Sequence, residues 1–229
     1  VSRVVDLCAA PGGWSQVVSQ KLGDREDVKI VAVDVQSMAP IEGVFTIEGD
    51  ITDKNTASAI IKCFDGSPAD LVLCDGAPDV LKMHDLDEYH QGQLLLAAFS
   101  IMCNILIPGG TFLAKIFRGK GVPHLVSQFQ SFFKEVIILK PSTSRNSSIE
   151  CFVLCTNFHL PSGFIPCMEK PLLSLEEISH SYKPVTFQVC GNETYDPDTT
   201  YPLELDDKEC YKYQNPEQSP IKPAYAASL

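Results

Sequence analysis

Up to about residue 155, short apolar runs alternate with stretches in which apolar residues recur every three or four positions. The runs rich in β-branched residues predict buried strands at residues 3–7, 29–34, 44–47, 71–74, 111–116, 136–139 and 149–155. The helical periodicity predicts helices at residues 14–21, 56–64, 89–106 and 122–133. Pro108-Gly109-Gly110 is expected to end the third helix and to turn the chain into the next strand. Strands and helices that alternate in this way predict a doubly wound α/β sheet with helices on both faces.

The sequence pattern changes after residue 155. Residues 156–229 hold nine of the 16 prolines and show little periodicity, apart from one short helix candidate at Leu172–His180. We therefore divide the chain into an α/β domain at residues 1–155 and an acidic, proline-rich extension at residues 156–229. At the other end, Val1 to Arg3 lead directly into the expected central strand. Domains of this type usually carry a covering element before that strand, so we expect a missing N-terminal segment.

Composition places the chain among soluble globular proteins, with 45% hydrophobic and 21% charged residues. The longest apolar stretch, Leu94–Ile107, is too short for a membrane span of about 20 residues, and it is interrupted by Ser100 and Asn104. No secretion signal opens the chain. The nine cysteines are scattered without a CxxC pair, which favours free buried thiols in a reducing compartment and hence a cytoplasmic location.

The net charge of −11 argues against a nucleic-acid binder, but the charge is unevenly distributed. Between Lys115 and Arg145, six basic residues face the single acid Glu135, which gives a local charge of +5. Because salt screens fields beyond about 8–10 Å, this local excess matters more for phosphate contact than the total does. It indicates either an RNA-binding patch or a solvated helix face.

Three polar sites follow predicted strands in the first half. The glycine-rich turn from Asp6 to Trp14 joins a strand to a helix at the edge where open α/β sheets bind ligands. Asp34 ends the next strand, where a carboxylate can accept hydrogen bonds from ribose hydroxyls, and Asp50 follows the third. Each aspartate alone could equally cap a helix. Together they indicate an adenosine-containing cofactor, and the absence of GxGxxG disfavours a dinucleotide and a dehydrogenase.

Two charged residues lie in otherwise apolar strands. Lys115 is in the sequence AKIFRG and Glu150 opens another apolar run, while Asp75 ends the strand at residues 71–74. A buried lysine is costly unless it points out at an edge or works in a site. The alternatives are a functional cluster and a structural ion pair between neighbouring strand ends.

These motifs, in this order, resemble those of the FtsJ-type RNA 2'-O-ribose methyltransferases. The resemblance rests on DLCAAPGGWSQ, VAVD, GDIT, CDGAPD, AKIFRG and SRNSSIE, and it covers residues 1 to about 155. CDGAPDVLKMHDLDEYHQGQLLLAA is most similar to the eukaryotic branch that methylates the tRNA anticodon loop. The later stretches SGFIPCMEKPLL, YDPDTTYPLEL and YKYQNP resemble the C-terminal extension of that branch.

The resemblance implies a Rossmann-like class I methyltransferase sheet that uses S-adenosylmethionine and releases S-adenosylhomocysteine. It implies that Lys115 is the proton acceptor, beside Asp75 and Glu150, in an active-site tetrad. The first tetrad lysine belongs to the segment expected before the first strand, so this chain should bind cofactor but methylate slowly or not at all. The cofactor-binding residues it implies are Gly12, Trp14, Asp34, Asp50 and Asp75. The expected RNA-binding residues are Arg118, Lys120 and Arg145.

The partners expected from the resemblance are tRNA and an accessory protein subunit that selects the nucleotide. No membrane or metal is expected, because the methyl donor arrives activated and the five histidines are dispersed. Two other functions stay open: an S-adenosylmethionine-binding subunit without activity, and a 2'-O-methyltransferase acting on ribosomal RNA.

Overall fold

The computed structural model describes residues 1–23, 25–77, 84–119, 121–141, 144, 148–168 and 185–190, without the side chains of residues 84–88. The strands are β1 (Arg3–Leu7), β2 (Lys29–Asp34), β3 (Val44–Glu48), β4 (Ala69–Cys74), β5 (Leu106–Phe117), β6 (Phe133–Pro141), β7 (Glu150–Phe158) and β8 (Thr186–Cys190). The helices are α1 (Gly13–Leu22), α2 (Lys54–Cys63), α3 (His84–Ile105) and α4 (Val122–Phe132).

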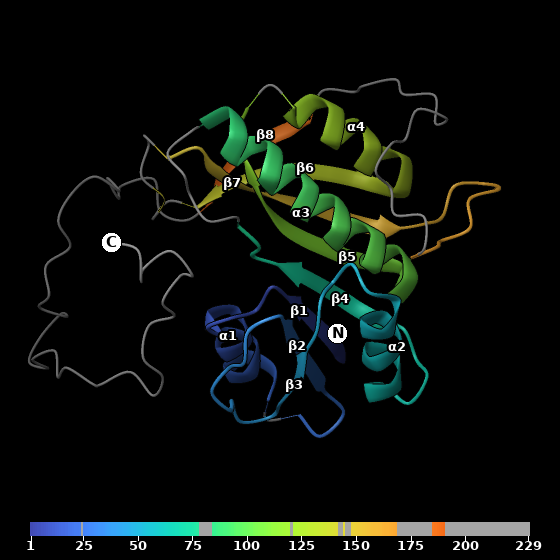
Figure 1. Cartoon of the computed structure of the whole chain (residues 1–229). Helices are drawn as coiled ribbons and strands as arrows, with labels where there is room; N and C mark the ends of the chain where they lie inside the picture. Colours follow the sequence, from blue (N-terminus) through green and yellow to red (C-terminus); the bar gives the residue numbers. More distant parts are fainter. Residues whose placement is uncertain are drawn as a thin grey trace, which may run out of the picture.

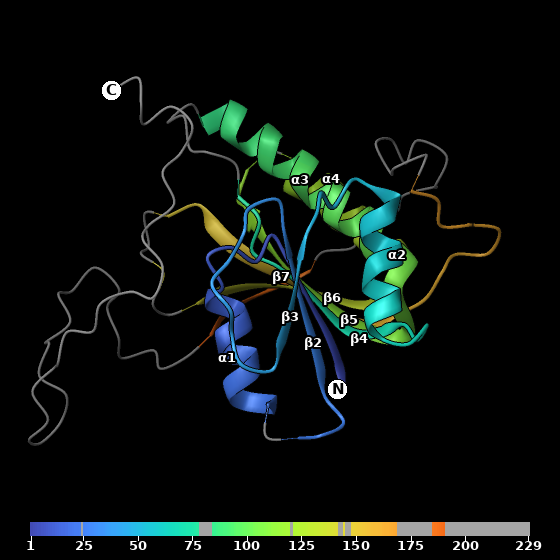
Figure 2. The ribbon, with the colours of Figure 1, turned by 60° about the horizontal axis from the view of Figure 1, so that its bottom comes forward.

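All eight described strands form one sheet in the order β3-β2-β1-β4-β5-β7-β6-β8 (Figure 1). The first five strands in this order, β3, β2, β1, β4 and β5, are parallel to one another. Strand β7 lies between β5 and β6 and is antiparallel to both. Among the described helices, α1 lies on one face, and α2, α3 and α4 lie on the other (Figure 2). The predicted doubly wound α/β sheet with helices on both faces is therefore confirmed.

The central strands are buried because they are apolar on both faces. In β1 and β2 nearly every side chain is buried, which is typical of parallel strands covered by helices on both sides. The carboxyl ends of β1, β2, β3, β4 and β5 meet at one edge of the sheet, because these strands are parallel. The residues that follow them are thereby brought together.

Several predicted boundaries were wrong. Strand β5 begins at Leu106 and not at residue 111: the register with β4 passes from Ala69↔Leu106 to Leu71↔Thr111. Pro108 to Gly110 thus form a bulge inside the strand, where Gly109 has a φ of 83°. Strand β7 runs to Phe158, and β6 begins at Phe133, where a helix residue was expected.

Strand β8 was not predicted. It pairs in parallel with β6, from Ile137↔Thr186 to Pro141↔Cys190, so part of the C-terminal extension joins the sheet. Its side chains are almost all exposed, which explains why the strand lacks a clear hydrophobic pattern. The helix expected at residues 172–180 lies outside the described residues.

All eight described cysteines are free thiols, as predicted. The expectation that they are buried holds for Cys74, Cys103, Cys151 and Cys155; it was wrong for Cys167, which is exposed, and Cys8, Cys63 and Cys190 are only half-buried. Among the residues that the structure describes, no helix is long and apolar enough to cross a membrane.

The largest part of the core lies between β5, β6 and the helices α3 and α4. At its centre Phe99 is fully buried, with ring centroids 4.8 Å from Phe129, 5.1 Å from Phe132 and 6.2 Å from Phe112. Packing of this density is sensitive to any loss of volume. The aromatic cluster therefore fixes the two helices against the strand that carries Lys115.

We expect Phe99→Ala to lower the free energy of unfolding by about 3–5 kcal/mol, because it removes a large buried side chain and leaves a cavity. Phe45→Ala is the matched control, since Phe45 is 58% exposed on the edge strand β3 and should cost under about 1 kcal/mol. Denaturant unfolding followed by circular dichroism measures both. Equal losses for the two variants would contradict this description of the core.

Candidate functional site

Lys115 lies between two carboxylates at the edge where strands β4, β5 and β7 end or begin. Its Nζ is 2.9 Å from Asp75 Oδ1 and 3.8 Å from Glu150 Oε2. The lysine side chain is 11% exposed and each carboxylate side chain is 38% exposed, so the carboxylates are more accessible to solvent than the lysine is. The structure thus brings together the three residues that the sequence singled out.

The strand order explains why these residues meet. Asp75 directly follows β4, which pairs with β5 as far as Cys74↔Ala114, one residue before Lys115. On the other side, Phe117 of β5 pairs with Glu150 at the start of β7. The start of β7 is held by the buried Lys140, whose Nζ donates to Ser148 O at 2.7 Å and Glu150 O at 2.9 Å.

The turn between β1 and α1 is built on Gly12. This residue has a φ of 114°, a left-handed conformation that favours glycine, and a Cβ added here would lie 2.7 Å from Ile41 Cδ1. The carbonyl of Gly12 accepts the first helical bond from Gln16 N at 2.9 Å. The free amides of the α1 N-terminus therefore lie at the same edge of the sheet as Lys115.

Asp34 ties this turn to the end of β2. Its Oδ2 accepts a hydrogen bond from Ala10 N at 2.9 Å, and its Oδ1 accepts one from Gln36 N at 2.9 Å. The carboxylate is half-buried, and each oxygen can accept a second bond. It can therefore serve both the loop and a hydroxyl of a ligand.

Asp50 is exposed and makes local bonds. Its Oδ1 accepts from Thr52 N at 2.8 Å and from Thr52 Oγ1 at 2.7 Å, in a turn that precedes α2. The N-cap of α2 is Asp53, which accepts from Asn55 N. Asp50 is therefore not the N-cap of α2.

Trp14 connects the turn to the lysine cluster. Its ring lies 5.5 Å from that of Phe152, centroid to centroid, at an interplanar angle of 38°. Phe152 pairs directly with Lys115 across β5 and β7, so both side chains lie on one face of the sheet. The tryptophan therefore lies on the same face as the lysine.

Asp6 is a buried carboxylate that sequence reasoning did not single out as a candidate site residue. It is fully buried in β1; its Oδ2 accepts from Ser15 Oγ at 2.6 Å, while its Oδ1 has no hydrogen-bond partner among the described residues. Burial raises the pKa of this carboxyl from 3.8 to about 6, with smaller contributions from the charges of Asp75 and Asp34. The signal was present in the sequence: a carboxylate inside the apolar run VVDL, like the lysine in AKIF.

The expected RNA-binding residues are only partly described. Arg118 is exposed beyond β5, and its guanidinium lies 5.1 Å from the ring centroid of Phe187 in β8. This cation–π contact joins the C-terminal extension to the region beside Glu150. Lys120 and Arg145 lie outside the described residues.

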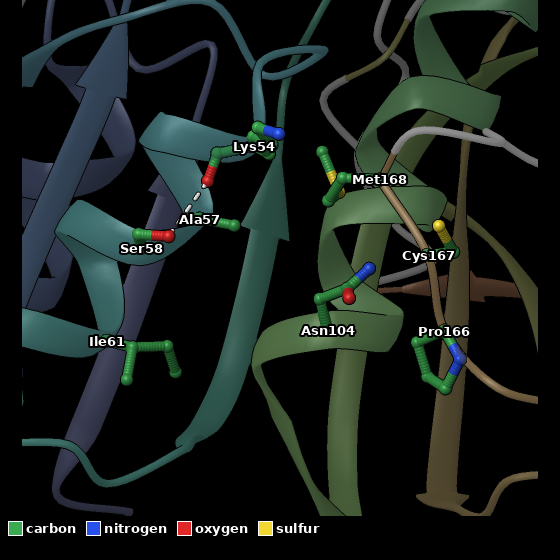
Figure 3. Close-up of a pocket in the computed structure, with 8 residues that line it drawn as sticks. All are labelled: Lys54, Ala57, Ser58, Ile61, Asn104, Pro166, Cys167 and Met168. Carbon is green, nitrogen blue, oxygen red and sulfur yellow. Dashed lines mark hydrogen bonds between the residues drawn. The ribbon is translucent and has the colours of Figure 1, made fainter.

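The structure also has a pocket of about 530 Å³ (Figure 3). It lies between α2, α3 and the segment that follows β7, and it is lined by Lys54, Ala57, Ser58, Ile61, Asn104, Pro166, Cys167 and Met168. None of the predicted site residues lines it. Among the described residues, no group of three or more His, Cys, Asp or Glu is arranged to hold a metal ion.

The fold and site can be compared with known proteins. The model of the FtsJ-like methyltransferase family matches residues 1–158. A Homo sapiens tRNA (cytidine(32)/guanosine(34)-2'-O)-methyltransferase is 53% identical, over 98% of this chain and 71% of its own length. The Schizosaccharomyces pombe protein of the same name is 50% identical, over 90% of this chain and 75% of its own.

A crystal structure of a Plasmodium falciparum ribosomal RNA methyltransferase superposes with a TM-score of 0.62 at 23% identity, over 69% of this chain and 86% of that chain. This likeness supports the α/β fold. Since the family model covers more than half of the 229 residues, the chain belongs to the FtsJ-like methyltransferase family. The resemblance inferred from the motifs is confirmed.

We expect Asp6→Asn to remove part of the pH dependence of stability. Because the folded-state pKa of Asp6 lies at about 6, above its ordinary 3.8, the folded protein loses stability as pH rises through this interval. Relative to the wild type, the variant should gain about 2 kcal/mol between pH 4.5 and pH 7.5. Denaturant unfolding at the two pH values measures this, and an equal pH dependence in both proteins would refute it.

Proposed function

We propose that this protein transfers a methyl group from S-adenosylmethionine to ribose 2'-hydroxyls in the anticodon loop of tRNA. The observation that carries the proposal is Lys115 between Asp75 and Glu150 at the carboxyl edge of the sheet. The names of the relatives, which specify cytidine 32 and guanosine 34 of tRNA, favour this substrate over ribosomal RNA.

The residues at the edge of β1 and β2 fit an adenosylmethionine. Asp6 offers a buried carboxylate oxygen that has no hydrogen-bond partner among the described residues, which suits a cationic group, and Asp34 suits ribose hydroxyls. Gly12, Trp14, Asp50 and Asp75 would complete the binding site. When bound, the cofactor supplies a methyl group on a positively charged sulfur, and S-adenosylhomocysteine is its product.

The protein's own part of the reaction is to align the ribose and to accept its proton. Lys115 Nζ would be the acceptor: its lone pair would take the proton of the 2'-hydroxyl as that oxygen gains the methyl group and S-adenosylhomocysteine leaves. Asp75 and Glu150 then stabilise the resulting ammonium, and they hold the side chain at the mouth of the site. Alignment of the reacting groups supplies a large share of the rate.

RNA would be bound by the basic patch that includes Arg118, Lys120 and Arg145. Phosphate contacts from such residues dominate affinity, and an unpaired loop lets one nucleotide enter a pocket. Because the net charge is −11, we propose that an accessory protein subunit contributes to tRNA binding and selects the nucleotide. The free thiols support a cytoplasmic location.

The cofactor site is tested by Asp34→Asn. A hydrogen bond to a charged group contributes about 1.5–3 kcal/mol, so S-adenosylmethionine should bind about 10- to 100-fold more weakly by calorimetry. Asp27→Asn is the control, because Asp27 pairs with Arg25 at the opposite edge of the sheet and should not alter binding. Wild-type affinity in the Asp34 variant would contradict the assignment.

The proton acceptor is tested by Lys115→Met in the natural full-length protein. Loss of a general base should lower single-turnover methyl transfer to a tRNA transcript by about 10²- to 10⁴-fold, while cofactor affinity is retained. Lys62→Met, at an exposed position of α2 outside the basic patch, is the control and should transfer normally. If the two variants transfer methyl groups at the same rate, Lys115 is not the base. If the wild type binds the cofactor but transfers no methyl group, the protein is better explained as an inactive binding subunit.

A further inference from the structure

Gln91 is a buried polar residue of α3 that bonds to the backbone of the strand carrying Lys115. It is 2% exposed. Its Nε2 donates to Lys115 O at 2.6 Å, and its Oε1 accepts from Phe117 N at 3.4 Å. One carboxamide thus satisfies two main-chain groups, one on each side of Ile116.

The strand order explains why these groups need a side-chain partner. Strand β4 ends at Cys74, opposite Ala114, so β5 continues for three residues beyond its neighbour. Successive residues of a strand turn their main-chain groups to opposite edges. Arg118 N donates to Ile149 O, beside β7, so the groups of Lys115 and Phe117 face the edge that β4 has left. A buried main-chain group without a partner costs about 1–3 kcal/mol.

The geometry points to Gln91 as a positioning residue for methyl transfer: we propose that it holds the end of β5 so that Lys115 Nζ stays between Asp75 and Glu150. This inference rests on the proposed function. Gln91 donates to the main-chain carbonyl of Lys115 and accepts from the main-chain amide of Phe117. Phe117 in turn pairs with Glu150 across β5 and β7. The side-chain carboxamide of Gln91 therefore holds β5 at Lys115 itself and at Phe117, the residue that pairs with Glu150.

The consequence is a specific sensitivity to small movements. The Lys115 Nζ–Asp75 distance of 2.9 Å is that of a charge-assisted hydrogen bond, whereas 3.8 Å to Glu150 leaves only an ion pair. A shift of the strand end by a fraction of an ångström would change which carboxylate binds the amine. A misplacement of about 1 Å can cost about 10²-fold in rate.

The test compares Gln91→Leu with Gln128→Leu in the natural full-length protein. Gln128 is the matched control: it is a buried glutamine, 3% exposed, on α4, and its Nε2 lies 3.0 Å from His124 Nε2, away from Lys115. Gln91→Leu should lower kcat for methyl transfer about 10- to 100-fold, with the KM for S-adenosylmethionine changed less than about twofold. The pH profile of kcat in this variant should shift, because the distances from Lys115 Nζ to Asp75 and Glu150 change. Gln128→Leu should keep the wild-type kcat and pH profile.

A second variant covers the case in which Gln91→Leu does not fold. Gln91→Glu keeps the length and the acceptor for Phe117 N–H, but it places a carboxylate oxygen against Lys115 O, so kcat should also fall. Hydrogen exchange of the Phe117 amide gives a readout apart from activity and should accelerate in Gln91→Leu, not in Gln128→Leu. Wild-type kcat and exchange in the Gln91 variants, with an active wild type, would overturn the positioning role alone. Absence of transfer by the wild type would instead overturn the proposed function.

Discussion

The site depends on the compensation of one positive charge inside an apolar strand. An ammonium group is costly to remove from water unless it is paired, and Lys115 is 11% exposed in a strand whose neighbours are largely apolar. Its two carboxylates come from different strands, Asp75 after β4 and Glu150 at the start of β7. The ion-pair cluster therefore requires β5 to lie between these two strands. The antiparallel insertion of β7 meets that requirement, because it turns the start of β7 toward the edge where the parallel strands end.

The other half of the site depends on the turn after β1. Gly12 permits the backbone to enter α1, and Asp34 fixes the turn by binding Ala10 N. Asp6, in the strand before this turn, is a buried carboxylate with one oxygen that has no hydrogen-bond partner in the described part of the chain, and such burial costs stability. Trp14 and Phe152 then connect this half to the face that carries Lys115. This cost in stability at Asp6 is consistent with a site that binds a cationic group.

Much of this was predictable from the sequence, for physical reasons. Buried parallel strands are continuous apolar runs, so β1, β2 and β4 were found, and Lys115 and Glu150 stood out as charges within such runs. Strand β8 could not be found in this way, because its side chains are exposed on both faces. Asp6 was recoverable by the argument used for Lys115. The contact of Gln91 was not, because it depends on β4 ending three residues before β5 does, which only the three-dimensional register reveals.

We propose that the lysine cluster acts on a ribose hydroxyl of the anticodon loop. The most direct measurement is transfer of a radiolabelled methyl group from S-adenosylmethionine to a tRNA transcript by the natural full-length protein with its accessory subunit. The all-ribose transcript is compared with one that carries 2'-deoxyribose at nucleotides 32 and 34, the positions in the relatives' names. We expect transfer to the first transcript and none to the second. Equal transfer to both would contradict it, because the methyl group would then be attached to a base or to another part of the tRNA.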